Sequence, residues 1–131
     1  MKIKILLAAV LSLAAGALAE ETGPTLRIDH PMVVGSLTKD DIRQTVHLHE
    51  AEVRQCYDAG RKLKPGIGGE VTASFVIDVT GAVSHVRITQ STLKNANVEN
   101  CMINHLTHWH FPRPNHGEVK VTYPWRLTAN S

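Results

Sequence analysis

The chain has 131 residues, of which 14 are Lys or Arg and 12 are Asp or Glu, and 43% are hydrophobic. If the first 19 residues, which hold Lys2 and Lys4, are removed, 14 − 2 = 12 basic residues remain against 12 acidic ones. A formally neutral chain without a basic run lacks the charge pattern expected of a protein that binds nucleic acid or anionic lipid. The length suits one domain with one modest core.

The first segment, residues 1–19, is typical of a secretory signal peptide. An apolar run from Ile5 to Leu18 follows a basic start, and Ala17-Leu18-Ala19 supplies a small-x-small cleavage pattern before Glu20. The run is shorter than the roughly 20 residues that span a bilayer, which disfavours an uncleaved membrane anchor. We therefore expect cleavage near Ala19-Glu20 and a periplasmic or secreted product, which is not an integral membrane protein.

Residues 20–34 are predicted to form an extended leader, with a short strand at Leu26 to Ile28, and residues 35–131 the domain itself. A helix is expected to begin near Thr38, whose side chain can cap it. Several residues of this stretch fall on one face of the predicted helix, which we expect to be buried. They are Ile42, Val46, His49, Val53, Cys56 and Leu63. Gly60 and Pro65-Gly66 are expected to end the helix.

The stretch from Gly69 to Ser91 predicts a β-hairpin. Val71, Ala73, Phe75 and Ile77 alternate with polar residues except at Val76, and Gly81 suits the turn because glycine readily adopts a positive φ. After the turn, Val86 and Ile88 are expected on one face, and His85, Arg87 and Thr89 on the other.

A second helix is predicted from Val98 to His110, capped by Asn95 or Asn97. The last element, Val119 to Leu127, alternates apolar and polar residues and predicts a half-buried strand. Pro124 removes one backbone donor, so we expect this strand at an edge of the sheet. The order is therefore helix, hairpin, helix, strand. We expect the large aromatics Trp109, Phe111 and Trp125 to pack in the core.

Cys56 and Cys101 are the two cysteines of the chain, one on the inward face of each predicted helix. In a small secreted domain this arrangement indicates a disulfide. Two buried free thiols are the alternative, and a catalytic or metal-binding thiol is a further one, although an apolar helix face disfavours the reactive thiolate.

The ordered motifs resemble those of the AgmX/PglI C-terminal domain family, which is related to the TonB C-terminal domain. They are Cys56-Tyr57, Gly69, Phe75-Val76-Ile77-Asp78 with Gly81 and Val83, Ser91-Thr92-Leu93, Val98-Glu99-Asn100-Cys101, Trp109-His110-Phe111-Pro112 and Tyr123-Pro124-Trp125. The resemblance covers Gly35 to Leu127.

This resemblance implies an α+β fold in the order α-β-β-α-β, with two helices on one face of a small antiparallel sheet of about three strands. It also implies an envelope protein-interaction module, linked to motility or transport, that takes up an extended partner segment at the last strand. The partner-binding residues would then be Val119, Lys120, Val121, Thr122, Tyr123, Pro124, Trp125 and Arg126. The inner-membrane helix and Pro-rich segment that TonB uses to transmit force are not recognisable in this sequence.

Two other functions remain open on the sequence. His105 and His108 stand three apart on the second predicted helix with His110 nearby, so they suggest a metal site, although no compact three-ligand spacing appears and we expect no cofactor. Pairing of two edge strands would instead give a structural homo-oligomer, such as a homodimer. No nucleophile stands in an activating context, so we expect the protein not to be an enzyme.

Overall fold

The computed structural model describes residues 30–129, so the expected signal peptide, most of the leader and the strand expected at Leu26–Ile28 lie outside the described residues. The elements in chain order are β1 (Met32–Val34), α1 (Lys39–Leu48), α2 (Glu50–Leu63), β2 (Gly69–Ile77), β3 (Val83–Ser91), α3 (Ala96–Leu106) and β4 (Val119–Leu127). The predicted α+β class is confirmed, with three helices and four strands in this part of the chain. None of these helices has the length and apolar character needed to cross a membrane.

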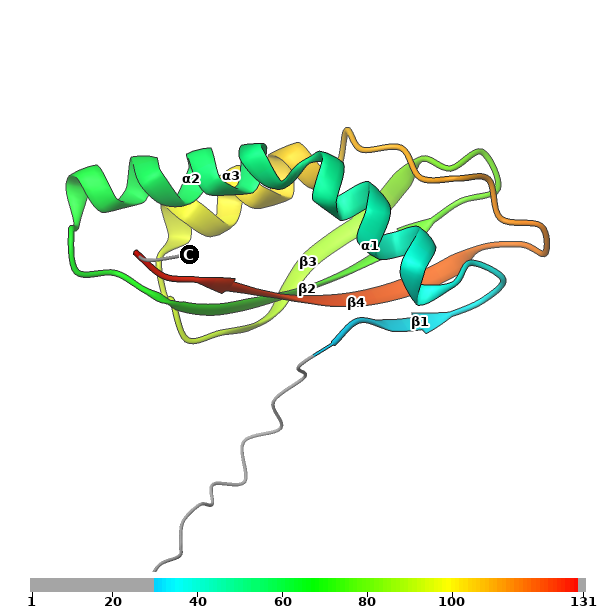
Figure 1. Ribbon diagram of the computed structural model, residues 1–131, viewed down its shortest axis with the longest axis horizontal. Coiled ribbons are helices and arrows are strands. Elements are labelled where there is room, and N and C mark those ends of the chain that lie inside the picture. Colours follow the sequence, from blue (N-terminus) through cyan, green and yellow to red (C-terminus); the bar gives the residue numbers. More distant parts are fainter. Residues whose placement is uncertain (1–29, 130–131) are drawn as a thin grey trace, which may run out of the picture.

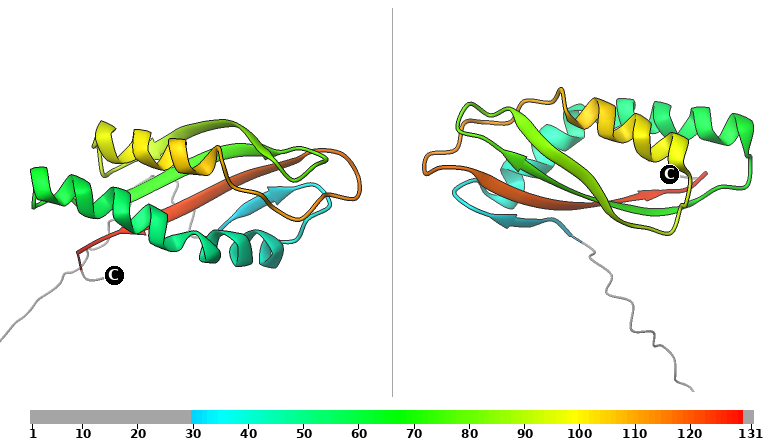
Figure 2. Two further views of the ribbon diagram at one scale, coloured as in Figure 1. Left: turned by 90° about the horizontal axis from the view of Figure 1, so that it is seen from above. Right: turned by 180° about the vertical axis from the view of Figure 1, so that it is seen from behind.

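The four strands form one antiparallel sheet in the order β1-β4-β2-β3. β4 pairs with β2 along its whole length, from Gly69 opposite Leu127 to Ile77 opposite Val119. All three helices of residues 30–129 lie on one face of the sheet, as Figures 1 and 2 show, and in this part of the chain no helix covers the other face. The core therefore lies between a single helical layer and a single sheet.

The expected first helix is two helices that meet at His49, whose φ of −106° and ψ of 11° interrupt the helical backbone. The predicted start near Thr38 is confirmed, since α1 begins at Lys39. The Thr38 hydroxyl accepts a hydrogen bond from the backbone N–H of Asp41 at 3.0 Å, while the Asp41 carboxylate accepts one from Thr38 at 2.8 Å. This reciprocal capping box satisfies two donors that a helix start otherwise leaves unpaired.

The expected end of this helix is wrong at Gly60. α2 continues through Gly60 and ends at Leu63. Gly60 allows α3 to pack closely against α2, because a Cβ on this residue would collide with Cγ2 of Val98. Leu63, which we placed on the buried stripe, is 79% exposed.

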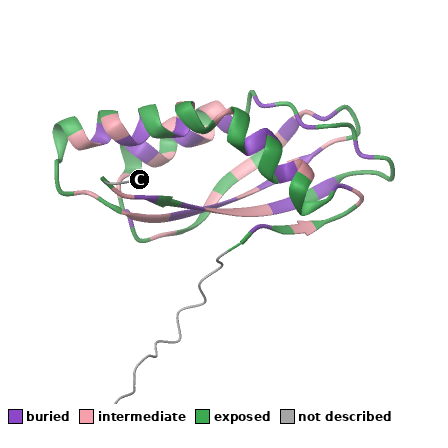
Figure 3. Ribbon diagram, in the orientation of Figure 1, coloured by how far each residue is buried: buried purple, intermediate pink, exposed green. Residues whose placement is uncertain are grey.

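Most of the predicted core is confirmed, and buried residues follow the contact between the helical layer and the sheet (Figure 3). The hairpin forms as expected, with Gly81 at a φ of +91° and in close approach to the carbonyl of Phe111. α3 begins after Asn95, whose side chain accepts a hydrogen bond from Val98 N–H at 3.1 Å, but it ends at Leu106 rather than His110. The chain then leaves the helix, and Trp109 and Phe111 enter the core.

Candidate functional site

The last strand, β4, is not the simple edge strand that we expected. β1 pairs with it through Met32–Thr122, Val33–Val121 and Val34–Lys120. β1 belongs to the sheet, although the sequence assigned it to the leader. The edge assignment is therefore wrong for Lys120 to Thr122, where β4 lies between β1 and β2. At Pro124 itself the edge prediction is confirmed, because this residue lies beyond the part that β1 covers and is paired only with Thr72 of β2 among residues 30–129.

The second half of β4, Tyr123 to Leu127, has a paired strand only on its β2 side within residues 30–129. We call this segment the open half of β4. Pro31, which directly precedes β1, and Pro124 carry no backbone N–H, so neither can donate a hydrogen bond where the β1–β4 ladder stops. The remaining backbone groups of an unpaired strand side are available to another extended chain.

Two aromatic side chains of the open half lie together. The rings of Tyr123 and Trp125 have centroids 4.7 Å apart, and Trp125 is buried while Tyr123 is half-buried. Burial raises the pKa of Tyr123, and Glu50 raises it further while Arg43 lowers it. Nε1 of Trp125 is buried without a hydrogen-bond partner among residues 30–129. A buried indole N–H usually finds an acceptor, so this donor is a distinctive feature of the site.

An apolar side chain on α1 is exposed near the open half. Leu48 is 82% exposed and borders, with Arg43, Gln44 and His47, a surface hollow of about 470 Å³. The positive charge of Arg43, at the border of this hollow, acts on Tyr123 and lowers its pKa. The outward side chain of Arg126 is held differently, by an ion pair with Glu70 at 2.9 Å.

The predicted disulfide is confirmed. Cys56 of α2 and Cys101 of α3 are bonded, with Cα atoms 5.6 Å apart and a sequence separation of 45. Neither residue is therefore a free thiol. The bond joins α2 to α3 within the helical layer.

The three histidines suggested as a metal site do not converge. Nδ1 of His108 lies 2.8 Å from the carbonyl of Asn104, and His110 forms a β-bridge with Ala82. Across residues 30–129, the group whose ligand atoms lie within 4.8 Å of one another is Cys56, Cys101 and His105. Its two sulfurs are bonded to each other, so they are not thiolate ligands in this state.

One polar cluster was missed by the sequence analysis. Oε1 of Glu52 accepts a hydrogen bond from Nε1 of Trp109 at 2.8 Å and lies 3.2 Å from Nδ1 of His105, while Oε2 lies 2.9 Å from Nδ1 of His49. These contacts, first that of His49 and then that of Trp109, lower the pKa of Glu52. The spacing of three between His49 and Glu52 was a visible signal, but the approach of Trp109 was not.

No family model matches the chain, and no curated protein matches it. Among solved structures, it is similar to the C-terminal domain of TonB from Helicobacter pylori, residues 179–285, determined by solution NMR. The TM-score is 0.44 and the identity 16%, over 72% of this chain and 86% of that domain. Such a similarity is too low to assign a family or a function, so the resemblance to the AgmX/PglI family stays a prediction.

Proposed function

We propose that this protein is a protein–protein interaction module of the cell envelope, periplasmic or secreted, which binds an extended partner segment as an added strand. The observation that carries the proposal is the open half of β4, because Tyr123 to Leu127 is paired on one side only within the described part of the chain. In this mode of recognition, main-chain hydrogen bonds supply affinity, and pockets for alternate side chains supply specificity.

The surroundings of the open half favour a partner with apolar or aromatic side chains toward the helical layer. Tyr123 is half-buried there, and the exposed Leu48 of α1 is a further apolar contact. On the other face, Arg126 and Glu70 form an ion pair that can contact polar side chains. The partner segment thus meets an apolar side and a charged side, which matches the alternation of an extended chain.

The location outside the cytoplasm is part of the same proposal. A disulfide such as Cys56–Cys101 persists in oxidising compartments and is rare in the cytosol. The expected signal peptide agrees with this location. The association with a motility or transport complex rests on the sequence resemblance alone, and the identity of the captured partner tests it.

The decisive experiment is photo-crosslinking in living cells with benzoylphenylalanine in place of Tyr123. Lys62, exposed on α2, serves as the control position. The captured segment is then identified by mass spectrometry, synthesised and added to the isotopically labelled protein. We expect it to protect the backbone amide of Arg126 from hydrogen exchange, because alternate residues of β4 face the open side, whereas the amides of Trp125 and Leu127 face β2.

Three results would contradict this function. Equal capture from Lys62 would show that the contact is not specific to the open half of β4. A synthetic segment that binds without protecting the amide of Arg126 would show that binding does not add a strand. Capture of nothing but further copies of this protein would replace the proposal with a structural homo-oligomer.

A further inference from the structure

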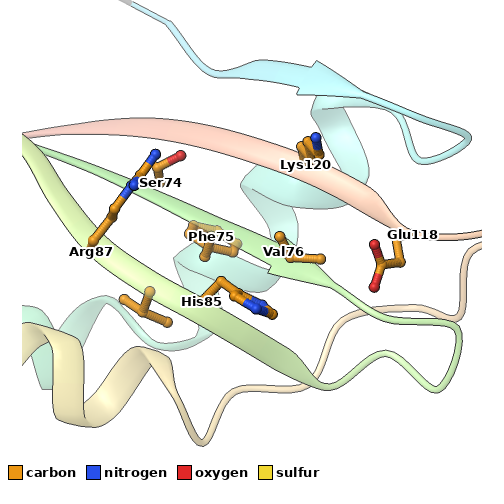
Figure 4. A pocket seen from close by; sticks show the side chains of 8 residues that line it. Ser74, Phe75, Val76, His85, Arg87, Glu118 and Lys120 are labelled. Carbon is orange, nitrogen blue, oxygen red and sulfur yellow. The ribbon is translucent and has the colours of Figure 1, made fainter.

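The sheet face away from the helices carries a second site. A hollow of about 540 Å³ lies on this face, lined by residues of β2, β3 and β4 and of the segment before β4. Figure 4 shows Ser74 and Val76 between the side chains of Arg87 and His85 on one side and those of Lys120 and Glu118 on the other. The volume lies within the range of roughly 300–1,000 Å³ that is usual for ligand sites.

A β-bulge determines which charge faces this hollow. Val76 pairs with Ser84, but Ser74 pairs with Arg87, so two steps along β2 correspond to three along β3. Because side chains alternate between faces, a regular register would place Arg87 opposite Ala73, on the helix-covered face. The extra residue instead brings Arg87 to the outer face.

The bulge includes a residue in an uncommon backbone conformation. His85 has a φ of +54°, in the left-handed region that residues other than glycine seldom adopt. Bulges often redirect a side chain beside a functional site, and backbone strain gathers at such sites. Here the irregular backbone and the change of face occur at the same place, next to the hollow.

The charges around the hollow have no partners in the described residues. Arg87 and Lys120 are exposed, and neither side chain makes a hydrogen bond or an ion pair within residues 30–129. Glu118, at the end of the hollow, is exposed, and its side chain also makes no hydrogen bond or ion pair within residues 30–129. Between the two cations, the half-buried Val76 provides an apolar floor. The hollow therefore offers two separated positive charges around an apolar centre.

This pattern fits an extended acidic chain better than a small anion. Arg87 and Lys120 belong to strands two spacings apart, which is roughly 10 Å. In an extended segment, side chains at every second position point to the same face. Two carboxylates placed two residues before and two residues after an inward apolar residue therefore lie roughly 14 Å apart. The long side chains of Arg87 and Lys120 can reach both of them. A phosphate ion has no apolar group that could contact Val76.

We propose that this hollow binds an acidic segment of a partner protein, in which two carboxylates flank an apolar side chain. The site is separate from the open half of β4, so it does not depend on strand addition there. The probe for the test is the capped heptapeptide Thr-Glu-Thr-Val-Thr-Glu-Thr, with its lysine counterpart, inorganic phosphate and phosphatidylglycerol vesicles as comparisons.

The experiment titrates each probe into the labelled protein and follows backbone amide shifts. The acidic peptide should shift Ser74, Val76, Arg87 and Lys120, and leave Trp125 and Leu127 unchanged. Reversing both cations, Arg87→Glu with Lys120→Glu, should weaken its binding roughly tenfold or more. The control, Arg54→Glu with Lys62→Glu, makes the same change of net charge on exposed positions of α2 and should bind like the unmodified protein.

A second variant tests the proposal independently if the double charge reversal disturbs folding. Glu118→Gln removes the repulsive carboxylate and should tighten binding of the acidic peptide. The proposal is overturned if the acidic peptide causes no saturable shifts, or if the lysine peptide binds equally well. It is also overturned if phosphate or the vesicles bind this hollow and the peptide does not. Shifts confined to Trp125 and Leu127 would support strand addition and contradict the second site.

Discussion

Glu52 of α2 and Trp109, which are 57 residues apart, are joined by a hydrogen bond from the indole Nε1 to the carboxylate Oε1 at 2.8 Å. The ring of His49 stacks on Trp109 with centroids 4.5 Å apart, at the point where α1 and α2 meet. One carboxylate thus links the start of α2, the segment after α3 and, through His105, α3 itself.

Replacement of Glu52 should destabilise the fold. Glu52→Ala leaves the indole N–H of the buried Trp109 without its acceptor, which we expect to cost about 1–2 kcal/mol of unfolding free energy. The control is Glu50→Ala, because Glu50 makes a similar contact of 3.2 Å with His47 but both side chains are exposed. Its expected cost is below about 0.5 kcal/mol. Urea unfolding followed by Trp fluorescence measures both, and equal costs would show that the Glu52 cluster is no more than a surface contact.

The same carboxylate predicts a pH dependence. The hydrogen bonds of His49 and Trp109 lower the pKa of Glu52 in the folded protein, so the unfolded chain takes up a proton first as the pH falls. The contribution of Glu52 to stability is therefore complete above about pH 5 and decreases as the pH falls through its folded pKa.

The measurement compares unfolding free energies of the protein and Glu52→Gln between neutral pH and pH 3. The difference between the two should shrink below about pH 5, since the amide cannot titrate. A difference that stays constant with pH would contradict the lowered pKa.

Loss of the disulfide should be costly. Cys56 and Cys101 close a loop with a sequence separation of 45, for which the chain-entropy model gives about 4 kcal/mol. We expect Cys56→Ala with Cys101→Ala to lose about 2–4 kcal/mol by urea unfolding, since both sites also lose some packing. Addition of a reducing agent should destabilise the unmodified protein and leave the double variant unchanged. Equal responses to the reductant would contradict a disulfide in solution.

The sequence predicted the elements that local pattern controls. Alternation in Val71 to Ile77 and the glycine at 81 were enough for the hairpin, and the paired inward cysteines were enough for the disulfide. It did not predict the break at His49, because the apolar stripe runs across that residue without interruption. Nor did it predict β1, since three residues are too short for a pattern, and their strand forms only because β4 lies beside them.

The binding region shows the same limit. The alternation of Val119 to Leu127 correctly predicted a strand, but its position in the sheet depends on pairing between segments about 90 residues apart, Met32 with Thr122. Likewise, Arg87 was correctly expected on the face opposite Ile88, whereas its place beside the hollow depends on a bulge in the β2–β3 register. The pattern of a single sequence predicts which face of a helix or strand is buried, but it contains little information on which distant segments pair with each other.

Gly60 shows how closely α2 and α3 approach, and its replacement gives a further prediction. A Cβ on this residue would collide with Cγ2 of Val98 and lie 3.1 Å from Cδ1 of Ile67. We expect Gly60→Ala to cost about 1–2 kcal/mol, because overpacking outweighs the better helix propensity of alanine. The control is Gly66→Ala, since a Cβ there meets no atom within 4 Å and should be nearly neutral.

A double-mutant cycle separates this overpacking from any other effect of alanine. Val98→Ala removes the methyl groups with which the new Cβ collides, so the double variant should be more stable than the sum of the two single changes predicts, by at least about 0.5 kcal/mol. Urea unfolding at a common temperature measures all four proteins. Strictly additive costs would mean that Gly60 and Val98 do not touch, and that the two disulfide-linked helices are farther apart in solution than the structure places them.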